Sequence, residues 1–272
     1  QWLEMVQQRA LPNYSISNDE KVEQDDDGMD VIRNRLHSHG LGDEQVELAV
    51  QSMQNQFDDE FPFNDNLTGF NPFQLQTPVS IQSLEQDWHS IYPLAKPFST
   101  HDQPFGDDDP WDLNTELDWA NWLMDHPQAF DSLDILDDLA TALVLHPQFG
   151  SDWVFDLMMT PILQRSEGIV DKVMAAEGVT ELPWIIETNR PALRALSRQV
   201  NLAAMNDDSD DLLQRSKKLL SINPSDNHGF RMIIMNELIF TGCDEEALEL
   251  AEDFPEDLNP EVIFGKILAL YR

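Results

Sequence analysis

The sequence predicts an all-α protein: an α-solenoid of antiparallel helical hairpins, preceded by an acidic irregular segment and a small helical hairpin. Two observations support this fold class. From Trp111 to the end, apolar residues recur at helical spacing, and no alternating pattern typical of strands competes with them. Pro and Gly interrupt these apolar stripes and leave helices of roughly 10 to 16 residues with short connections. Short connections favour antiparallel neighbours.

The N-terminal part divides by composition into three segments. Residues 1–28 show little periodicity and are predicted to be a flexible lead-in. Residues 29–57 contain two apolar helical patterns separated by Gly40 and Gly42, which predict a helical hairpin. Residues 58–112 hold seven of the 16 prolines, so continuous helix or sheet is not expected there. This last segment is either a strap that packs its Phe side chains on the helical body, which we favour, or an arm that binds a partner.

Residues 113–272 are predicted to be a helical repeat domain. Three apolar stripes are clearest: Leu133, Leu136, Ala140, Leu143 and Val144; Leu193, Leu196, Val200 and Ala203; and Leu212, Leu213, Ser216, Leu219 and Leu220. Pro191 and Pro260 lie where a first helical position is expected, and Asn259 is a suitable N-cap for the last helix. The expected helices include 191–205, 209–221 and 260–271.

The stretch 212–257 resembles a tetratricopeptide repeat, and the looser resemblance extends over about 191–272. Its signature residues are Asn223 and Pro224 after one hairpin, Gly242 in the next tight turn, Ala247 and Ala251 on the following helix, and Pro255 after it. Gly242 permits a turn that a Cβ would oppose. The two small alanines allow close approach, so we expect them to face the preceding helix.

The resemblance implies a curved α-solenoid that binds peptides or protein surfaces in a concave groove and has no chemistry of its own. The identity of the groove residues does not carry over. Arg190, Arg194 and Arg198 are spaced by four and therefore share one helix face. They either pair with the abundant acidic residues, which we favour, or form a stripe that contacts a partner.

The charge balance excludes whole classes of partner. The formal net charge is -35, from 16 basic and 51 acidic residues, which argues against direct binding to nucleic acid or to an anionic membrane. Between Leu36 and Leu163 there are 23 acidic residues and one basic residue, Lys96. These acids either serve solubility or bind a protein partner with a basic surface. In the second case the run Asp107, Asp108 and Asp109 is a candidate contact.

No catalytic, cofactor-binding or metal site is predicted. The sequence has no Gly-rich phosphate loop, no GxSxG and no HExxH motif. His37 and His39 have no further His or Cys beside them, so a zinc site is not expected. The single cysteine, Cys243, has no nearby His and is predicted to be a buried or half-buried structural thiol. One cysteine fits a reducing compartment such as the cytoplasm.

These features predict a noncatalytic protein-interaction or adaptor module with a helical-repeat scaffold and a strongly acidic surface. The alternative is an acidic mimic of nucleic acid that occupies the basic groove of a DNA- or RNA-binding protein. Salt dependence separates the two functions. Binding by mimicry weakens steeply as salt rises, whereas recognition of an apolar peptide is nearly indifferent to salt.

Overall fold

The structure is a computed structural model that describes residues 6–17, 73–92, 118–145, 152–255 and 257–272. All of these residues belong to one compact unit. The described part of the chain is mostly helical, which confirms the predicted helical class. The predicted hairpin at 29–57 lies outside the described residues, as do His37, His39 and the run Asp107, Asp108 and Asp109.

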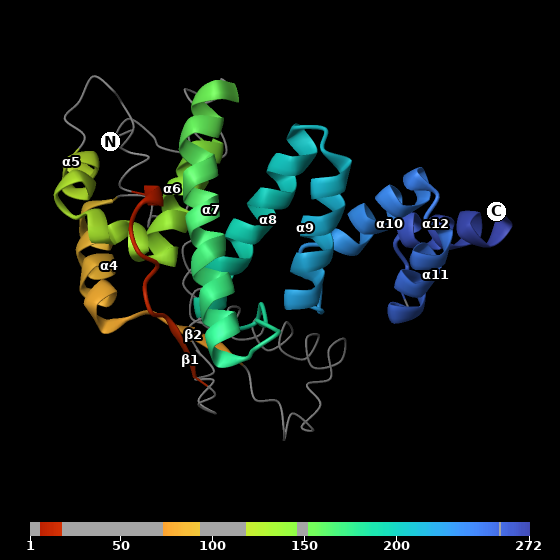
Figure 1. The fold of residues 1–272 in the computed structure, drawn as a ribbon, viewed down its shortest axis with the longest axis horizontal. Coiled ribbons are helices and arrows are strands. Elements are labelled where there is room, and N and C mark those ends of the chain that lie inside the picture. The colour runs from red at the N-terminus through yellow and green to blue at the C-terminus, as the bar shows by residue number, and fades with distance from the viewer. Residues whose placement is uncertain (1–5, 18–72, 93–117, 146–151, 256) are drawn as a thin grey trace, which may run out of the picture. The chain divides into compact units, whose positions relative to one another are not determined.

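Figure 1 shows the order of the elements along the chain. They are β1 (Ser15–Ser17), β2 (Gln74–Gln76), α4 (Val79–Ile91), α5 (Asp118–Asp125), α6 (Leu133–Leu145), α7 (Asp152–Glu177), α8 (Arg190–Met205), α9 (Ser209–Ile222), α10 (Phe230–Thr241), α11 (Asp244–Asp253) and α12 (Pro260–Tyr271). Two short 3-10 helices, η2 (Pro127–Asp131) and η4 (Glu187–Asn189), precede α6 and α8. β1 and β2 pair antiparallel with Ile16 opposite Leu75.

Two segments before α5 are more ordered than the composition suggests. Residues 6–17 were expected to belong to a flexible lead-in, yet Val6 and Tyr14 are buried and β1 forms there. Residues 73–92 were expected to be irregular, yet they form β2 and α4. Pro78 directly precedes α4, and the helix itself contains neither Pro nor Gly. The high proline content of the whole segment predicts irregular structure, but its prolines lie outside residues 79–91, so a regular helix forms there.

Arg165 of α7 fastens the N-terminal segment to the helical body. Its side chain is only 2% exposed and forms an ion pair with Asp131, which Arg9 also contacts at 2.9 Å. The same guanidinium donates to backbone carbonyls from two separate parts of the chain, those of Val6, Arg9, Ala10 and Phe130. A buried guanidinium needs all of its donors satisfied, so these acceptors are held in place together.

A second fastening uses Asn189, which is fully buried at the start of α8. Its side-chain oxygen accepts a hydrogen bond from the backbone N–H of Leu75 at 2.9 Å. Its amide group donates to the carbonyl of Phe73 at 2.8 Å and to that of Pro183 at 3.1 Å. One side chain thereby hydrogen-bonds the backbone N–H of Leu75 and the carbonyl of Phe73 and joins residues 73–75 to the start of α8.

The helices of the C-terminal part lie where the sequence predicts them. The expected helices 191–205, 209–221 and 260–271 agree within one residue with α8, α9 and α12. Each of α8 to α11 contacts the next helix in the sequence, and α10 also contacts α12. Most predicted stripe residues are buried, but Val144 is 54% exposed because it lies at the edge of the α6 stripe.

Helices α10, α11 and α12 have an apolar cluster of their own. It is formed by Ile234, Met235, Leu238, Ala247, Leu250, Ala251, Val262 and Ala269. Gly242 ends α10 in the left-handed conformation, with φ of 78°, as expected for a tight turn. Ala247 and Ala251 are buried with the residues of α10, which confirms the expected orientation of α11.

Replacing Arg165 with Met should lower the free energy of unfolding by about 3 kcal/mol, because Asp131 and four carbonyls lose their shared donor. Urea denaturation measures this change. Lys172, also on α7, donates to the carbonyls of Leu11 and Pro12 at exposed positions. Lys172→Met should therefore cost less than about 1 kcal/mol. Equal losses in the two variants would contradict the role assigned to Arg165.

Replacing Ala247 with Phe should cost about 1 to 3 kcal/mol, because the site between α10 and α11 has no room for a ring. Glu249→Gln, on the exposed face of the same helix, should cost less than about 0.5 kcal/mol. Thermal melting compares the two variants. An Ala247→Phe protein as stable as the Glu249→Gln protein would refute the packing described above.

Candidate functional site

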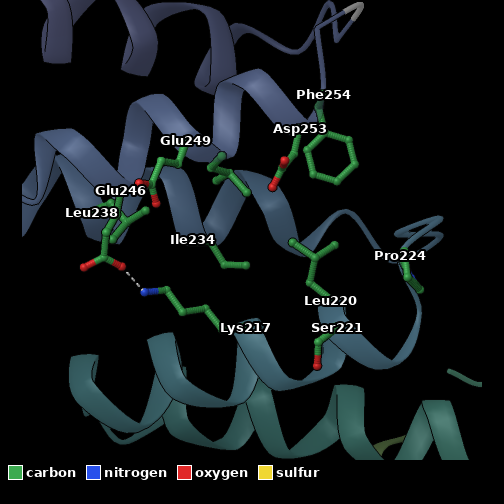
Figure 2. Close-up of a pocket in the computed structure, with 11 residues that line it drawn as sticks. Lys217, Leu220, Ser221, Pro224, Ile234, Leu238, Glu246, Glu249, Asp253 and Phe254 are labelled. Atoms are coloured by element: carbon green, nitrogen blue, oxygen red, sulfur yellow. Dashed lines mark hydrogen bonds and ion pairs between the residues drawn. The ribbon is translucent and has the colours of Figure 1, made fainter. Parts of the chain in front are cut away.

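A groove of about 490 Å³ lies between α9, α10 and α11 (Figure 2). Its volume falls within the range of roughly 300 to 1,000 Å³ that is usual for ligand sites. The apolar part of its lining consists of Leu220, Pro224, Ile234, Leu238, Leu250 and Phe254. Ile234, Leu238 and Leu250 are buried members of the apolar cluster and form the floor of the groove. Leu220 and Phe254 are only partly buried and Pro224 is exposed, so these three supply the accessible apolar surface.

Acidic side chains of α11 line one side of the groove. Glu246, Glu249 and Asp253 recur at spacings of three and four, which places them on one face of the helix. Glu246 forms an ion pair with Lys217 of α9. Glu249 and Asp253 have no hydrogen bond or ion pair with any residue that the structure describes. Figure 2 shows their side chains along the α11 side of the groove.

The dipole of α11 strengthens the negative character of this side. The backbone carbonyls at the C-terminal end of a helix carry partial negative charge, which basic side chains usually neutralise. The last turn of α11 contains no basic residue, and Asp253 is its final residue. A cation near Asp253 would therefore interact favourably with both the carboxylate and the helix end.

Arg231 fixes the end of the groove where Phe254 lies. It forms an ion pair with Asp226 at 2.8 Å and another with Asp257, and its guanidinium lies 5.3 Å from the centre of the Phe254 ring. Burial opposes ionisation of Asp257, but hydrogen bonds from Arg231 and Asn259 lower the pKa of its carboxyl group. Asp226 has φ of 47° and accepts hydrogen bonds from the backbone N–H groups of Phe230 and Arg231, so it caps α10.

Three of the residues on which the resemblance to a tetratricopeptide repeat rests lie in the connections on either side of this network. Asn223 is buried in the same connection as Asp226 and accepts a hydrogen bond from Ser225 at 2.8 Å, while Pro224 lines the groove. Pro255 follows α11 and is exposed. The sequence analysis missed Asp226 and Arg231. No capping pattern signals them, because an N-cap residue directly precedes its helix whereas Asp226 lies four residues before the start of α10.

The arginine stripe of α8 is engaged within the chain. Arg194 donates to the carboxylate of Asp137 at 2.6 Å, and Arg198 forms an ion pair with the same carboxylate. Arg190 pairs with Glu187 at 3.2 Å and lies over the ring of Trp184. Of the two alternatives for this stripe, the geometry favours internal ion pairs.

Cys243 is half-buried, as expected for a structural thiol, and begins the turn into α11.

The contact between α4 and α6 holds carboxyl groups in unusual environments. The pKa of Asp138 is raised to about 6, mainly by burial and also by the neighbouring Asp134 and Asp137, while the hydrogen bond from Trp88 opposes the rise. Burial also raises the pKa of Glu85, whose carboxylate accepts a hydrogen bond from Ser132 at 2.6 Å. Both carboxylates are thus bound by neighbouring side chains, and we interpret them as structural.

The described residues contain no group of three or more His, Cys, Asp or Glu side chains arranged to hold a metal ion. None of the helices described is both long and apolar enough to cross a membrane.

The chain matches no protein-family model, no curated protein and no solved structure. Its function is therefore argued from the groove and its charges.

Asp138→Asn should stabilise the protein by about 1 to 3 kcal/mol at pH 7.5 and by progressively less as the pH falls from about 6 towards 4. The folded-state pKa of Asp138 lies above its usual value, so ionisation costs stability as the pH rises through this window. Asn cannot ionise. Urea denaturation at several pH values measures the difference, with the exposed Asp125→Asn as a control for the change in net charge. A difference independent of pH would contradict the assignment.

Proposed function

We propose that this chain is a noncatalytic protein-interaction module, in which α8 to α12 form a tetratricopeptide-like part of an α-solenoid. The groove between α9, α10 and α11 binds a segment of a partner protein. One observation supports this proposal above the others: the groove combines accessible apolar side chains, those of Leu220, Pro224 and Phe254, with acidic side chains that have no partner among the described residues.

The groove selects a partner segment with an apolar anchor and basic side chains. Apolar side chains of the segment would cover Leu220, Pro224 and Phe254, whose exposed area is otherwise in contact with water. Lys or Arg residues would neutralise Glu249 and Asp253. The net charge of -35 would speed the approach of a basic partner and repel acidic ones.

The same features make the groove a poor imitation of nucleic acid. A phosphate backbone presents charge without an apolar floor, so a nucleic-acid mimic would gain nothing from the residues that line this groove. The groove therefore favours the interaction module over the mimic. Competition by nucleic acid for the partner would reverse this order.

A short helical peptide of leucine and lysine, with one apolar face, is a suitable probe, and its leucine and glutamate counterpart is the negative control. Fluorescence anisotropy should detect binding of the basic peptide only. Because this chain attracts cations in general, the decisive comparison is between variants. Glu249→Gln combined with Asp253→Asn should weaken binding about three- to tenfold, since each exposed ion pair contributes roughly 0.2 to 1 kcal/mol.

The matched control removes two acidic residues of the same helix that do not line the groove, Glu245 and Glu252, and should bind like the unmodified protein. Ser221→Phe tests the apolar part, because a ring at this exposed lining position fills the groove and leaves every charge in place. It should weaken binding about tenfold or more. Equal binding by the groove variants and the control would refute the proposal.

A further inference from the structure

We infer that Lys217 is an internal competitor for the groove: its ammonium group holds Glu246 when the groove is empty, and a basic residue of the bound segment displaces it. This inference rests on the proposed function and adds the class of segment that binds, an amphipathic helix with basic residues one helical turn apart.

Lys217 and Glu246 both line the groove but come from opposite walls, α9 and α11. Figure 2 shows the Lys217 side chain extended towards the Glu246 carboxylate, with the ion pair drawn between them. The two side chains are 43% and 52% exposed. Water can therefore solvate either group when the pair opens, and the pair is weak enough to exchange with a ligand.

The arrangement of carboxylates on α11 defines the ligand. Glu246, Glu249 and Asp253 follow one face of the helix, and only the first is neutralised by a described residue. A helix lying beside α11 with basic residues at i, i+3 or i+4, and i+7 would meet all three. To reach Glu246, its first basic residue must take the place of Lys217.

A helical ligand suits this groove better than an extended one. All described walls of the groove are helices or the connections after them, and helices satisfy their own backbone hydrogen bonds. An extended segment would find no strand edge there to receive its N–H and C=O groups. A helical segment brings its backbone already satisfied, and only its side chains must fit.

Arginine is the best replacement for Lys217. Its planar guanidinium can donate two parallel hydrogen bonds to one carboxylate, whereas the ammonium of Lys217 acts as a point charge. Lys217 has a flexible aliphatic stem, which can remain against the apolar wall while the ammonium moves to water. Displacement therefore leaves no buried charge unpaired.

The test measures the affinity of the leucine and lysine peptide for Lys217→Gln by fluorescence anisotropy at low salt. Affinity should rise about two- to fivefold, because the peptide no longer competes with an exposed ion pair. Lys217→Arg retains the pair and should bind no more tightly than the unmodified protein. The gain should shrink as the salt approaches 1 M, where the Debye length is about 3 Å.

The charge control is Lys266→Gln, which removes an exposed basic residue of α12 that does not line the groove. It should leave the affinity unchanged. An equal gain in this control would mean that net charge alone is responsible and would overturn the inference. Lys217→Met, which keeps the aliphatic stem, replaces Lys217→Gln if melting shows that the latter is unstable.

The remaining outcomes separate the two proposals. If the peptide binds in the groove but Lys217→Gln leaves its affinity unchanged or lowers it, Lys217 is not a competitor and the proposed function stands. If neither the unmodified protein nor Lys217→Gln binds the peptide, the proposed function fails and this inference fails with it.

Discussion

With 16 basic residues for 51 acidic ones, the chain has too few cations to pair with most of its carboxylates. The few arginine side chains therefore determine which segments are joined by ion pairs. Arg165 joins the N-terminal segment to α7 and η2. Arg194 and Arg198 join α8 to α6 through one carboxylate, Asp137. Arg231 joins the connection before α10 to the one after α11. Each of these arginines bridges distant parts of the sequence, so a small number of cations stabilises much of the described structure.

The same scarcity explains why α11 keeps unneutralised carboxylates beside an apolar groove. Folding alone would be served better by a basic residue in the last turn of α11, near Asp253. Arg231 instead contacts the ring of Phe254 at one end of the groove, while Glu249 remains free of internal partners among the described residues. The groove thus keeps a negative charge that no described cation neutralises. Basic residues of a partner would neutralise these carboxylates, which the described part of the chain does not.

Local signals in the sequence predict the C-terminal helices well, because their ends are set by single residues. Pro191, Asn259 and Pro260 mark helix starts, and Gly242 marks a helix end, wherever the rest of the chain lies. The order of residues 6–17 could not be predicted in this way, because their carbonyls are bound by Arg165 and Lys172, roughly 160 positions later. The groove depends likewise on a contact between two connections, and its lining residues come from three helices, α9, α10 and α11. Periodicity identifies a helix face but not the face that lies opposite.

Strong negative charge alone attracts cations without discriminating among them, so selectivity must come from the groove. A ligand with one basic residue that displaces Lys217 exchanges one exposed ion pair for another and gains almost nothing at Glu246. A ligand with further basic residues gains at Glu249 and Asp253, where no described residue of the chain competes. A ligand without an apolar face leaves Leu220 and Phe254 in contact with water. In this mode of binding, affinity rises only when a ligand presents several cations and an apolar anchor together. Lys217 contributes to this selectivity because it already pairs with Glu246, the first of the three carboxylates.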